Sequence, residues 1–293
     1  MNIALVTCQS LAQYAAPTVE DEDALLTRFL RAKGHRVTPE IWTDAAVDWP
    51  GYDVVVLKSP WDYFDRVQEF YAWLDRMAAL GVPMLNPGAR VRWNADKKYL
   101  LEMAQAGARI VPTHWLPRGS RFAPDALFAA LGTDQLIVKP AVSGGAKNTF
   151  SLDRAQAHAA VESLELLLQE EDFLAQPFLP QIQTEGEWSF IYLGGQFSHC
   201  VLKTPKSGDF RVQHYLGGHI EPHAAPPHLL ATADQLAARF APDCLYARVD
   251  GVEADGELLL MELELIEPFL YLASAEGSFA RYEEALQRVV AVS

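Results

Sequence analysis

Residues 245–268 read LYARVDGVEADGELLLMELELIEP. The Asp-Gly pair at 255–256 stands between two apolar runs, and such a pair is a strong signal for a β-hairpin. Alternate residues of a strand share a face, so Glu262 and Glu264 are predicted to point the same way. A hairpin with paired glutamates is the feature from which the rest of the chain is interpreted.

The two faces of this hairpin are predicted to differ. Arg248 and Asp250 share a face of the first strand, so three carboxylates are expected to converge there with Glu262 and Glu264. The same alternation places one apolar set beside the glutamates and a second set in the core. The first set is Leu258, Leu260 and Ile266, and the second is Leu259, Met261, Leu263 and Leu265.

Buried carboxylates repel one another and are costly to desolvate unless a cation joins them. Hard oxygen ligands suit Mg²⁺ or Mn²⁺, and Mg²⁺ usually shares its shell with phosphate oxygens. The predicted metal ligands are Asp250, Glu262 and Glu264, and the setting indicates a nucleotide-phosphate site. The alternative is an ordinary hairpin whose two glutamates lie at a wet rim.

The composition excludes several classes of protein. The chain has 293 residues, half of them hydrophobic, and a formal net charge of −14, which argues against a general binder of nucleic acid or acidic membranes. Its 3 cysteines are far apart and form no CxxC pair, which argues against a disulfide framework or a zinc site. We find no signal peptide and no run of membrane-spanning length, so a cytoplasmic protein is expected.

The first 90 residues alternate short apolar strands with helices, which predicts an α/β lobe around a parallel sheet. No G-x-G-x-x-G follows the first strand, so a dinucleotide fingerprint is absent. Loops after parallel strands face the ligand crevice, which makes Cys8, Trp61 and Asp62 candidates for substrate contact. Tyr63 is expected only to pack its loop.

Two lysines stand where an anionic ligand would need them. Lys97 lies at the start of a helix predicted over residues 94–107, where a positive charge opposes the helix dipole, so another purpose is expected for it. Lys139 ends an apolar strand and precedes the loop SGGAKNT at 143–149, whose small residues let backbone N–H groups approach phosphate. The loop does not match a P-loop, and a plain flexible hairpin is the alternative.

The second half of the chain supplies further elements. Residues 173–179, with Pro177 inside the segment and Pro180 directly after it, are interpreted as a linker between lobes that presents backbone groups to a base. Residues 204–218 are polar and are expected to form an active-site flap that includes Arg211. Helices are predicted over 155–170, 231–240 and 277–290.

Taken in order, these residues resemble the ATP-grasp superfamily, the fold of D-alanine–D-alanine ligase and glutathione synthetase. The match runs from about residue 86 to the end of the hairpin, and the N-terminal lobe also fits. The resemblance implies an α/β protein of α+β lobes. These are an N-terminal Rossmann-like parallel-sheet lobe that binds substrate (1–90), a central ATP-grasp lid lobe (91–175) and a C-terminal ATP-grasp lobe with the metal site (176–293).

The resemblance also implies a role for each candidate residue. The nucleotide would be held by two lysines, the glycine-rich loop, a hinge segment at adenine and an acid at the ribose: Lys97, Lys139, Ser143, Gly144, Gly145, Gln176, Phe178, Leu179 and Glu187. Three cationic residues resemble those near the phosphates and the reacting carboxylate, namely Lys203, Arg211 and Arg248. Asp250, Glu262 and Glu264 fall where the metal ligands lie.

Two departures concern the substrate end of the site. Glu264 stands where the family usually has Asn, and residues 266–269 (IEPF) replace the usual Pro-Gly. The segments 59–63, 92–97 and 262–268 look most like a subgroup that contains the cyclo-ligase of the D-cycloserine pathway, an antibiotic pathway.

The resemblance implies an ATP-dependent, Mg²⁺- or Mn²⁺-dependent carboxylate–amine ligase for a small amino-acid-like substrate. It would work through an acyl phosphate and release ADP and phosphate. Three alternatives stay open: a cyclo-ligase that closes an O-ureido amino acid to a ring, a kinase that releases a stable phosphorylated product, and a non-catalytic ATP-binding module. A homodimer is the default expectation for the assembly.

Overall fold

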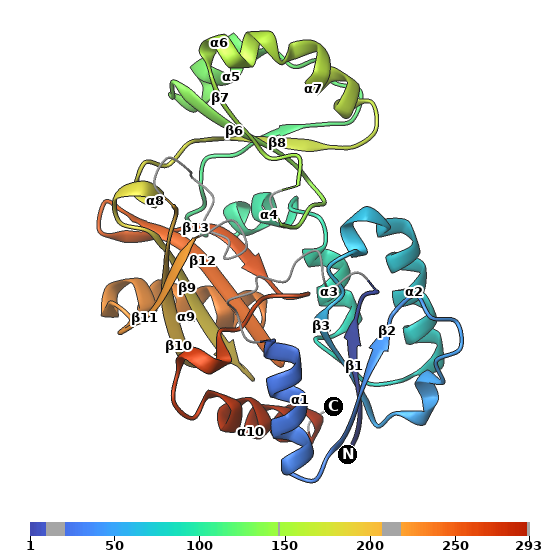
Figure 1. Cartoon of the computed structure of the whole chain (residues 1–293). Coiled ribbons are helices and arrows are strands. Elements are labelled where there is room, and N and C mark those ends of the chain that lie inside the picture. Colours follow the sequence, from blue (N-terminus) through green and yellow to red (C-terminus); the bar gives the residue numbers. More distant parts are fainter. Residues whose placement is uncertain (10–20, 146, 207–217, 292–293) are drawn as a thin grey trace.

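The computed structural model describes the whole chain except residues 10–20, 146, 207–217 and 292–293. Within the described residues, three separate β-sheets organise the fold. Figure 1 shows one sheet in an upper lobe and the other two side by side below it. No helix of the described part has both the length and the apolar character needed to cross a bilayer.

The N-terminal sheet is parallel and has the order β2-β1-β3-β4. Each face of this sheet packs against a hydrophobic core, because successive residues of β1 point to opposite sides. Helices α1 and α10 pack on one face, and α2 covers the other. The elements are β1 (Asn2–Thr7), α1 (Glu22–Ala32), β2 (Arg36–Ile41), β3 (Val54–Ser59), α2 (Val67–Leu80), β4 (Met84–Leu85) and α10 (Ser278–Val290).

The middle sheet is antiparallel, in the order β5-β8-β6-β7, and is covered by three helices. The segment expected to be a linker is its strand β8, paired on both sides; its prolines fall at or beyond the strand end, so the ladder keeps its donors. The single helix predicted over 155–170 is two helices. The elements are β5 (His114–Leu116), α5 (Pro124–Leu131), β6 (Gln135–Pro140), β7 (Phe150–Asp153), α6 (Arg154–Ala159), α7 (Val161–Leu168) and β8 (Phe173–Pro177).

The C-terminal sheet is antiparallel, in the order β11-β10-β9-β12-β13, with α9 packed on it. The helix predicted over 94–107 begins only at α4, after a turn that follows a separate helix, α3, which was not predicted; α4 packs in the core of this sheet. The elements are α3 (Gly88–Asn94), α4 (Tyr99–Gln105), α8 (Gln181–Thr184), β9 (Glu187–Leu193), β10 (Gln196–Thr204), β11 (His219–His223), α9 (Pro227–Phe240), β12 (Tyr246–Ala254) and β13 (Glu257–Glu264). The lobe boundaries drawn from the sequence stay predictions.

The predicted hairpin is β12 and β13, but its alternation is interrupted. The register shifts between Asp250 and Gly251, so Met261 of β13 has no partner in the ladder. One extra residue reverses the faces beyond it. Leu258 and Leu260 therefore lie in the same core as Leu263 and Leu265, and placing them beside the glutamates was wrong. Ile266 packs in the core of the N-terminal sheet instead.

Candidate active site

An arginine lies between two carboxylates on the hairpin. The register sets Arg248 opposite Glu264 and Asp250 opposite Glu262. Arg248 donates to Asp250 through Nε (3.0 Å) and Nη2 (2.9 Å), and Nη2 also contacts Glu264. Its Nη1 donates to the carbonyl of Phe269 (3.0 Å), in the segment that follows β13. The guanidinium makes these contacts at a buried position, since Arg248 is only 7% exposed.

Asp250 has further partners on the neighbouring strands. The Ser189 hydroxyl of β9 donates to it, and Nζ of Lys203 on β10 lies 3.4 Å from Oδ1. Burial opposes ionisation of Asp250, but Arg248 and Lys203 outweigh it and hold its pKa well below the usual range. Lys203 also donates to Glu187. Asp250 is thus an ionised group whose two oxygens are both engaged by side chains.

Two lysines from different elements meet on Glu262. Lys139 at the end of β6 donates to its Oε1 at 2.8 Å, and Nζ of Lys97 lies 4.0 Å from the same oxygen. Burial raises the pKa of Glu262, but the two lysines outweigh that and lower it to about 2. Lys97 lies in the turn between α3 and α4, not in a helix. Its own pKa is lowered, by burial first and also by the like charge of Lys139.

The glycine-rich loop is tied to the same cluster. Lys97 donates to the Ser143 carbonyl at 2.7 Å and lies 3.2 Å from its hydroxyl. Gly144 follows, and Gly145 adopts a left-handed conformation with φ 59°. The loop therefore starts beside two lysines, as its predicted role at phosphate requires.

The predicted hinge contacts lie at the end of β8. Gln176 is buried and donates from Nε2 to the Thr113 hydroxyl (2.9 Å). Phe178 donates its backbone N–H to the Gln135 carbonyl (2.9 Å), and Leu179 packs beside a small core cluster. Their predicted role at adenine stays a prediction, as does that of Glu187 at the ribose.

The predicted substrate residues have packing partners. Cys8 is buried at the end of β1. The Trp61 indole donates to the Glu267 carbonyl (3.2 Å), and Asp62 accepts from the Trp42 indole (2.6 Å). Tyr63 is buried in the core of its lobe, as expected for a packing role. Arg211 lies outside the described residues, together with most of the predicted flap.

A second polar cluster at the ends of β1 and β3 was not predicted. Lys58 is 1% exposed and pairs with Glu22 (2.9 Å) and Asp23 (3.2 Å). Ser59 donates to Asp23 and, at 2.9 Å, to Thr7. The feature of the sequence that could have indicated this cluster is Lys58, a lysine directly after the fully apolar run of β3. Glu22 and Asp23 stand in the first turn of α1.

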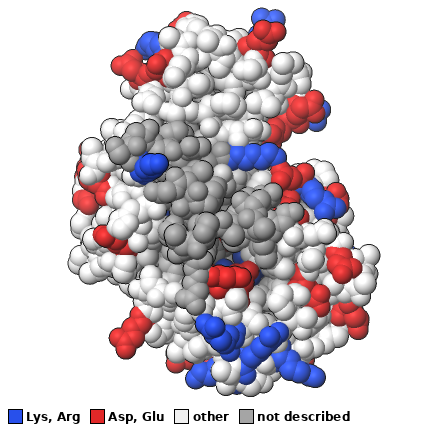
Figure 2. Space-filling model, viewed as in Figure 1, with Lys and Arg blue, Asp and Glu red and all other residues white. Residues whose placement is uncertain are grey.

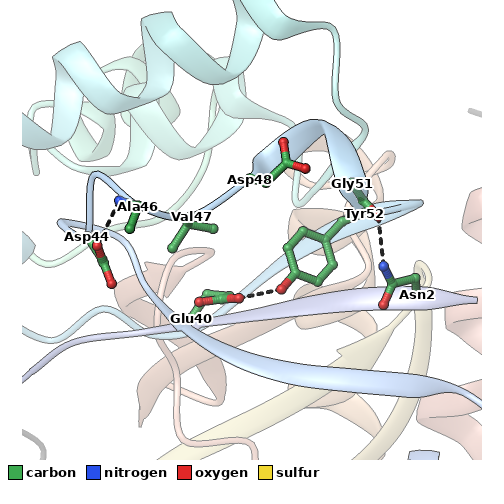
Figure 3. Close-up of a pocket in the computed structure, with 8 residues that line it drawn as sticks. All are labelled: Asn2, Glu40, Asp44, Ala46, Val47, Asp48, Gly51 and Tyr52. Carbon is green, nitrogen blue, oxygen red and sulfur yellow. Dashed lines mark hydrogen bonds between the residues drawn. The ribbon is translucent and has the colours of Figure 1, made fainter.

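The described part of the chain also has a pocket away from this site. It is lined at the outer edge of the N-terminal sheet by Asn2, Glu40, Asp44, Ala46, Val47, Asp48, Gly51 and Tyr52, with Tyr52 donating to Glu40 (Figure 3). Its polar groups bond to one another, and it lies apart from the hairpin carboxylates. On the face drawn in Figure 2, basic side chains gather mainly at one end, where Figure 1 places α1 and α10.

Comparisons with known proteins agree with this geometry. The family of prokaryotic glutathione synthetase ATP-grasp domains matches residues 126–259, and the family of D-cycloserine synthetase DcsG N-terminal domains matches residues 3–86. The chain contains an ATP-grasp domain and is an enzyme. This confirms the predicted fold class and the use of ATP, and it sets aside a non-catalytic module.

Individual relatives match most or all of the chain. The cycloserine biosynthesis protein DcsG of Streptomyces lavendulae is 29% identical over 267 residues, which cover 85% of this chain and 88% of the relative. The crystal structure of D-cycloserine synthetase DcsG matches with a TM-score of 0.84 and 27% identity over 99% of this chain and 100% of that one. An ATP complex of D-alanine–D-alanine ligase from Bacillus anthracis shares the fold, with a TM-score of 0.70 and 15% identity over 100% and 98% of the two chains.

Proposed function

We propose that this ATP-grasp ligase is a cyclo-ligase of the D-cycloserine synthetase type, which closes an O-ureido amino acid to a ring with consumption of ATP. The observation that carries the proposal is the family match over residues 3–86. ATP-grasp lobes are shared by ligases for many substrates, whereas the N-terminal lobe lines the crevice in which we place the substrate. A match in that lobe therefore bears on the substrate and not only on ATP.

The nucleotide is proposed to lie between the middle and C-terminal sheets. Lys97 and Lys139 supply positive charge beneath the glycine-rich loop. Lys203 supplies it from β10, on the β12 side of the hairpin, where it lies beside Asp250. In the proposal these charges stabilise the γ-phosphoryl group as it moves. Backbone N–H groups of Ser143, Gly144 and Gly145 cover the phosphates, and the hinge residues Gln176, Phe178 and Leu179 contact the base.

The carboxylates fit a divalent cation only in part. No group of three acidic, histidine or cysteine side chains is arranged for a metal among the residues that the structure describes. Asp250 is 2% exposed and both of its oxygens are engaged. The side chains of Glu262 and Glu264 are 28% and 27% exposed and keep free lone pairs. We therefore assign Mg²⁺ to Glu262 and Glu264, with Asp250 holding Arg248 and Lys203 in place.

When held by Glu262 and Glu264, Mg²⁺ would supply positive charge that neutralises the phosphate oxygens. Arg248 presents a rigid fork that matches a carboxylate or a tetrahedral oxyanion, so it is proposed to orient the reacting carboxyl group. Transfer of the γ-phosphoryl to that carboxylate gives an acyl phosphate and ADP. A nitrogen of the same molecule then attacks the acyl carbon, loses its proton and expels phosphate, which closes the ring.

Ligation of a carboxylate to a separate amine is the second candidate. It uses the same nucleotide site, and the match of residues 126–259 to glutathione synthetase ATP-grasp domains favours it. The two candidates differ in whether the nitrogen belongs to the activated molecule. A cyclo-ligase needs one small-molecule pocket, and a ligase of two substrates needs two.

Phosphate release from Mg-ATP separates the candidates. The assay uses O-ureido-serine alone, single amino acids, and amino acids in pairs. Release with O-ureido-serine alone supports the cyclo-ligase, and release that requires two acceptors favours the second candidate. A kinase would consume ATP without releasing phosphate. Tight binding of ATP with no turnover on any of these substrates would contradict both ligase proposals.

A further inference from the structure

The N-terminal lobe contacts the glycine-rich loop directly. A β-carbon added at Gly144 would lie 2.5 Å from Cε1 and 2.8 Å from Cδ1 of Phe64, in the loop between β3 and α2. Lys147 forms an ion pair with Asp65, and its Nζ lies 5.8 Å from the centre of the Phe64 ring. Val142 packs against the buried residues of the same lobe. Aromatic, ionic and apolar contacts thus hold the loop against the N-terminal lobe.

The ring accounts for the glycine at position 144. Gly144 lies outside the left-handed region, so its backbone conformation is open to any residue. What excludes a side chain is the Phe64 ring. Gly145 is different, because its φ of 59° favours glycine by itself. Gly144→Ala is therefore a steric probe of one contact between lobes.

The segment that carries Phe64 also reaches the C-terminal lobe. Trp61 donates from Nε1 to the Glu267 carbonyl (3.2 Å), three residues beyond Glu264. On the other side of the loop, Lys97 holds the Ser143 carbonyl (2.7 Å). Residues 59–65 therefore lie between the glycine-rich loop and the end of the carboxylate strand.

We propose that Phe64 and Asp65 are positioning residues that hold the glycine-rich loop closed over the nucleotide phosphates. The lobe that receives the acceptor substrate thereby sets the closure of the ATP site. This rests on the proposed function, which places the phosphates beneath the loop. Exposed ion pairs contribute at most about 1 kcal/mol, so the packing of Phe64 on Gly144 carries most of the effect. A loosened loop would bind nucleotide less tightly and admit water to the site.

A double-mutant cycle with Mg-AMPPNP tests the contact without turnover. Calorimetry gives the affinity of the wild-type protein, Gly144→Ala, Phe64→Ala and the double variant. Phe64→Ala is expected to bind about threefold to fivefold more weakly, and Gly144→Ala about tenfold more weakly because the methyl group forces loop and ring apart. In the double variant the space left by the ring accepts the methyl group, and affinity returns to within about threefold of Phe64→Ala.

Each other result of the cycle has a distinct meaning. A double variant as weak as Gly144→Ala, or Gly144→Ala as tight as wild type, would overturn the proposal. If the wild-type protein itself fails to bind Mg-AMPPNP, the proposed function fails and this proposal falls with it. Melting temperatures of the four proteins show whether any loss of affinity comes from unfolding.

A charge swap at the exposed pair gives variants that are expected to fold. Asp65→Lys and Lys147→Asp each place like charges together and should weaken Mg-AMPPNP binding about twofold to fivefold, and the swapped pair should return within about twofold of wild type. Glu69→Lys is the matched control, since Glu69 pairs with Arg66 of the same lobe and not with the loop. A swapped pair no tighter than the weaker single variant would overturn the role of Asp65.

Discussion

Glu262 is the residue on which the proposed phosphate site depends. It accepts from Lys139 at 2.8 Å, lies 4.0 Å from Lys97, and keeps 28% of its side chain exposed. The hairpin pattern predicted its orientation, and the family resemblance implied its role. The lysines could not be placed beside it from the hairpin alone, because they come from a turn and a strand more than a hundred residues away in the chain.

Replacing Glu262 with Gln keeps the shape of the side chain and removes its charge. We expect Mg-dependent ATP turnover to fall by about 100-fold or more, because the proposed metal and both lysines would lose their shared anion. Phosphate release at saturating Mg²⁺ measures this. Glu257→Gln on the same strand is the control, since its carboxylate is exposed and pairs with Arg109. Turnover retained by Glu262→Gln would contradict the metal assignment.

Glu267 is a carboxylate in the segment 266–269, which departs from the family pattern, and no role was predicted for it from the sequence. Burial raises its pKa to about 8, the neighbouring carboxylates Glu264 and Glu262 add to the shift, and Lys97 and Arg248 oppose it. In the folded protein it keeps a proton that the unfolded chain releases near its ordinary value of 4.5. Folding stability therefore falls as the pH rises from about 4.5 through about 8.

Glu267→Gln should remove this part of the pH dependence. In EDTA, we expect the variant to be about 1–3 kcal/mol more stable than wild type at pH 8 and nearly equal to it at pH 5, because a pKa shift of one unit corresponds to about 1.4 kcal/mol. Urea unfolding at both pH values measures the difference. A gap between the two proteins that stays constant from pH 5 to pH 8 would refute this account of Glu267.

At the scale of elements, the hairpin was predictable and its bulge was not. The Asp-Gly step identified the turn between β12 and β13 without any tertiary information. The unpaired Met261 leaves no trace in an apolar run that continues from Leu258 to Leu260, since leucine suits either face. The turn at residues 95–98 before α4 was missed for a similar reason, because Lys97 and its neighbours also fit the first turn of a helix.

Gly251 supports the bulge in the ladder. A β-carbon at this position would lie 2.5 Å from the Leu259 carbonyl oxygen and 2.9 Å from Cδ1 of Leu258. The carbonyl belongs to the paired backbone and has little room to move. We expect Gly251→Ala to lower the free energy of unfolding by about 1–3 kcal/mol in urea titrations.

Gly88→Ala is the matched control for that substitution. Gly88 begins α3, and the nearest atom to an added β-carbon there is Cδ2 of Leu74 at 4.0 Å. The substitution should leave stability unchanged or raise it by less than about 1 kcal/mol. Equal losses from the two variants would show that the close approach at the bulge is not what requires Gly251.

On the scale of the whole molecule, the candidate site lies where the three sheets meet. Lys139 of the middle sheet reaches Glu262 of the C-terminal sheet, and the loop after β13 is tied to the N-terminal lobe through Glu22, which accepts from the backbone N–H groups of Leu270 (2.9 Å) and Leu272 (2.8 Å). Sequence patterns predicted the parallel sheet of the N-terminal lobe and the hairpin of β12 and β13, but not strand β8 of the middle sheet. They did not predict these contacts, because buried pairs between lobes depend on how the lobes dock.

The way the lobes dock also bears on which substrate the protein binds. The N-terminal lobe matches the D-cycloserine synthetase family, and the glycine-rich loop rests on it through Phe64 and Asp65. One molecule that carries both the activated carboxyl group and the attacking nitrogen needs a single pocket beneath that loop. The central claim is therefore ring closure within one substrate.

Product analysis with O-ureido-serine as the sole acceptor tests that claim most directly. The protein is incubated with Mg-ATP and this one compound, and ADP, phosphate and the organic product are quantified together by mass spectrometry. We predict a cyclic product formed in equal amounts with ADP and phosphate. An open-chain amide, a stable phosphorylated substrate, or ATP consumption with no ring would contradict it.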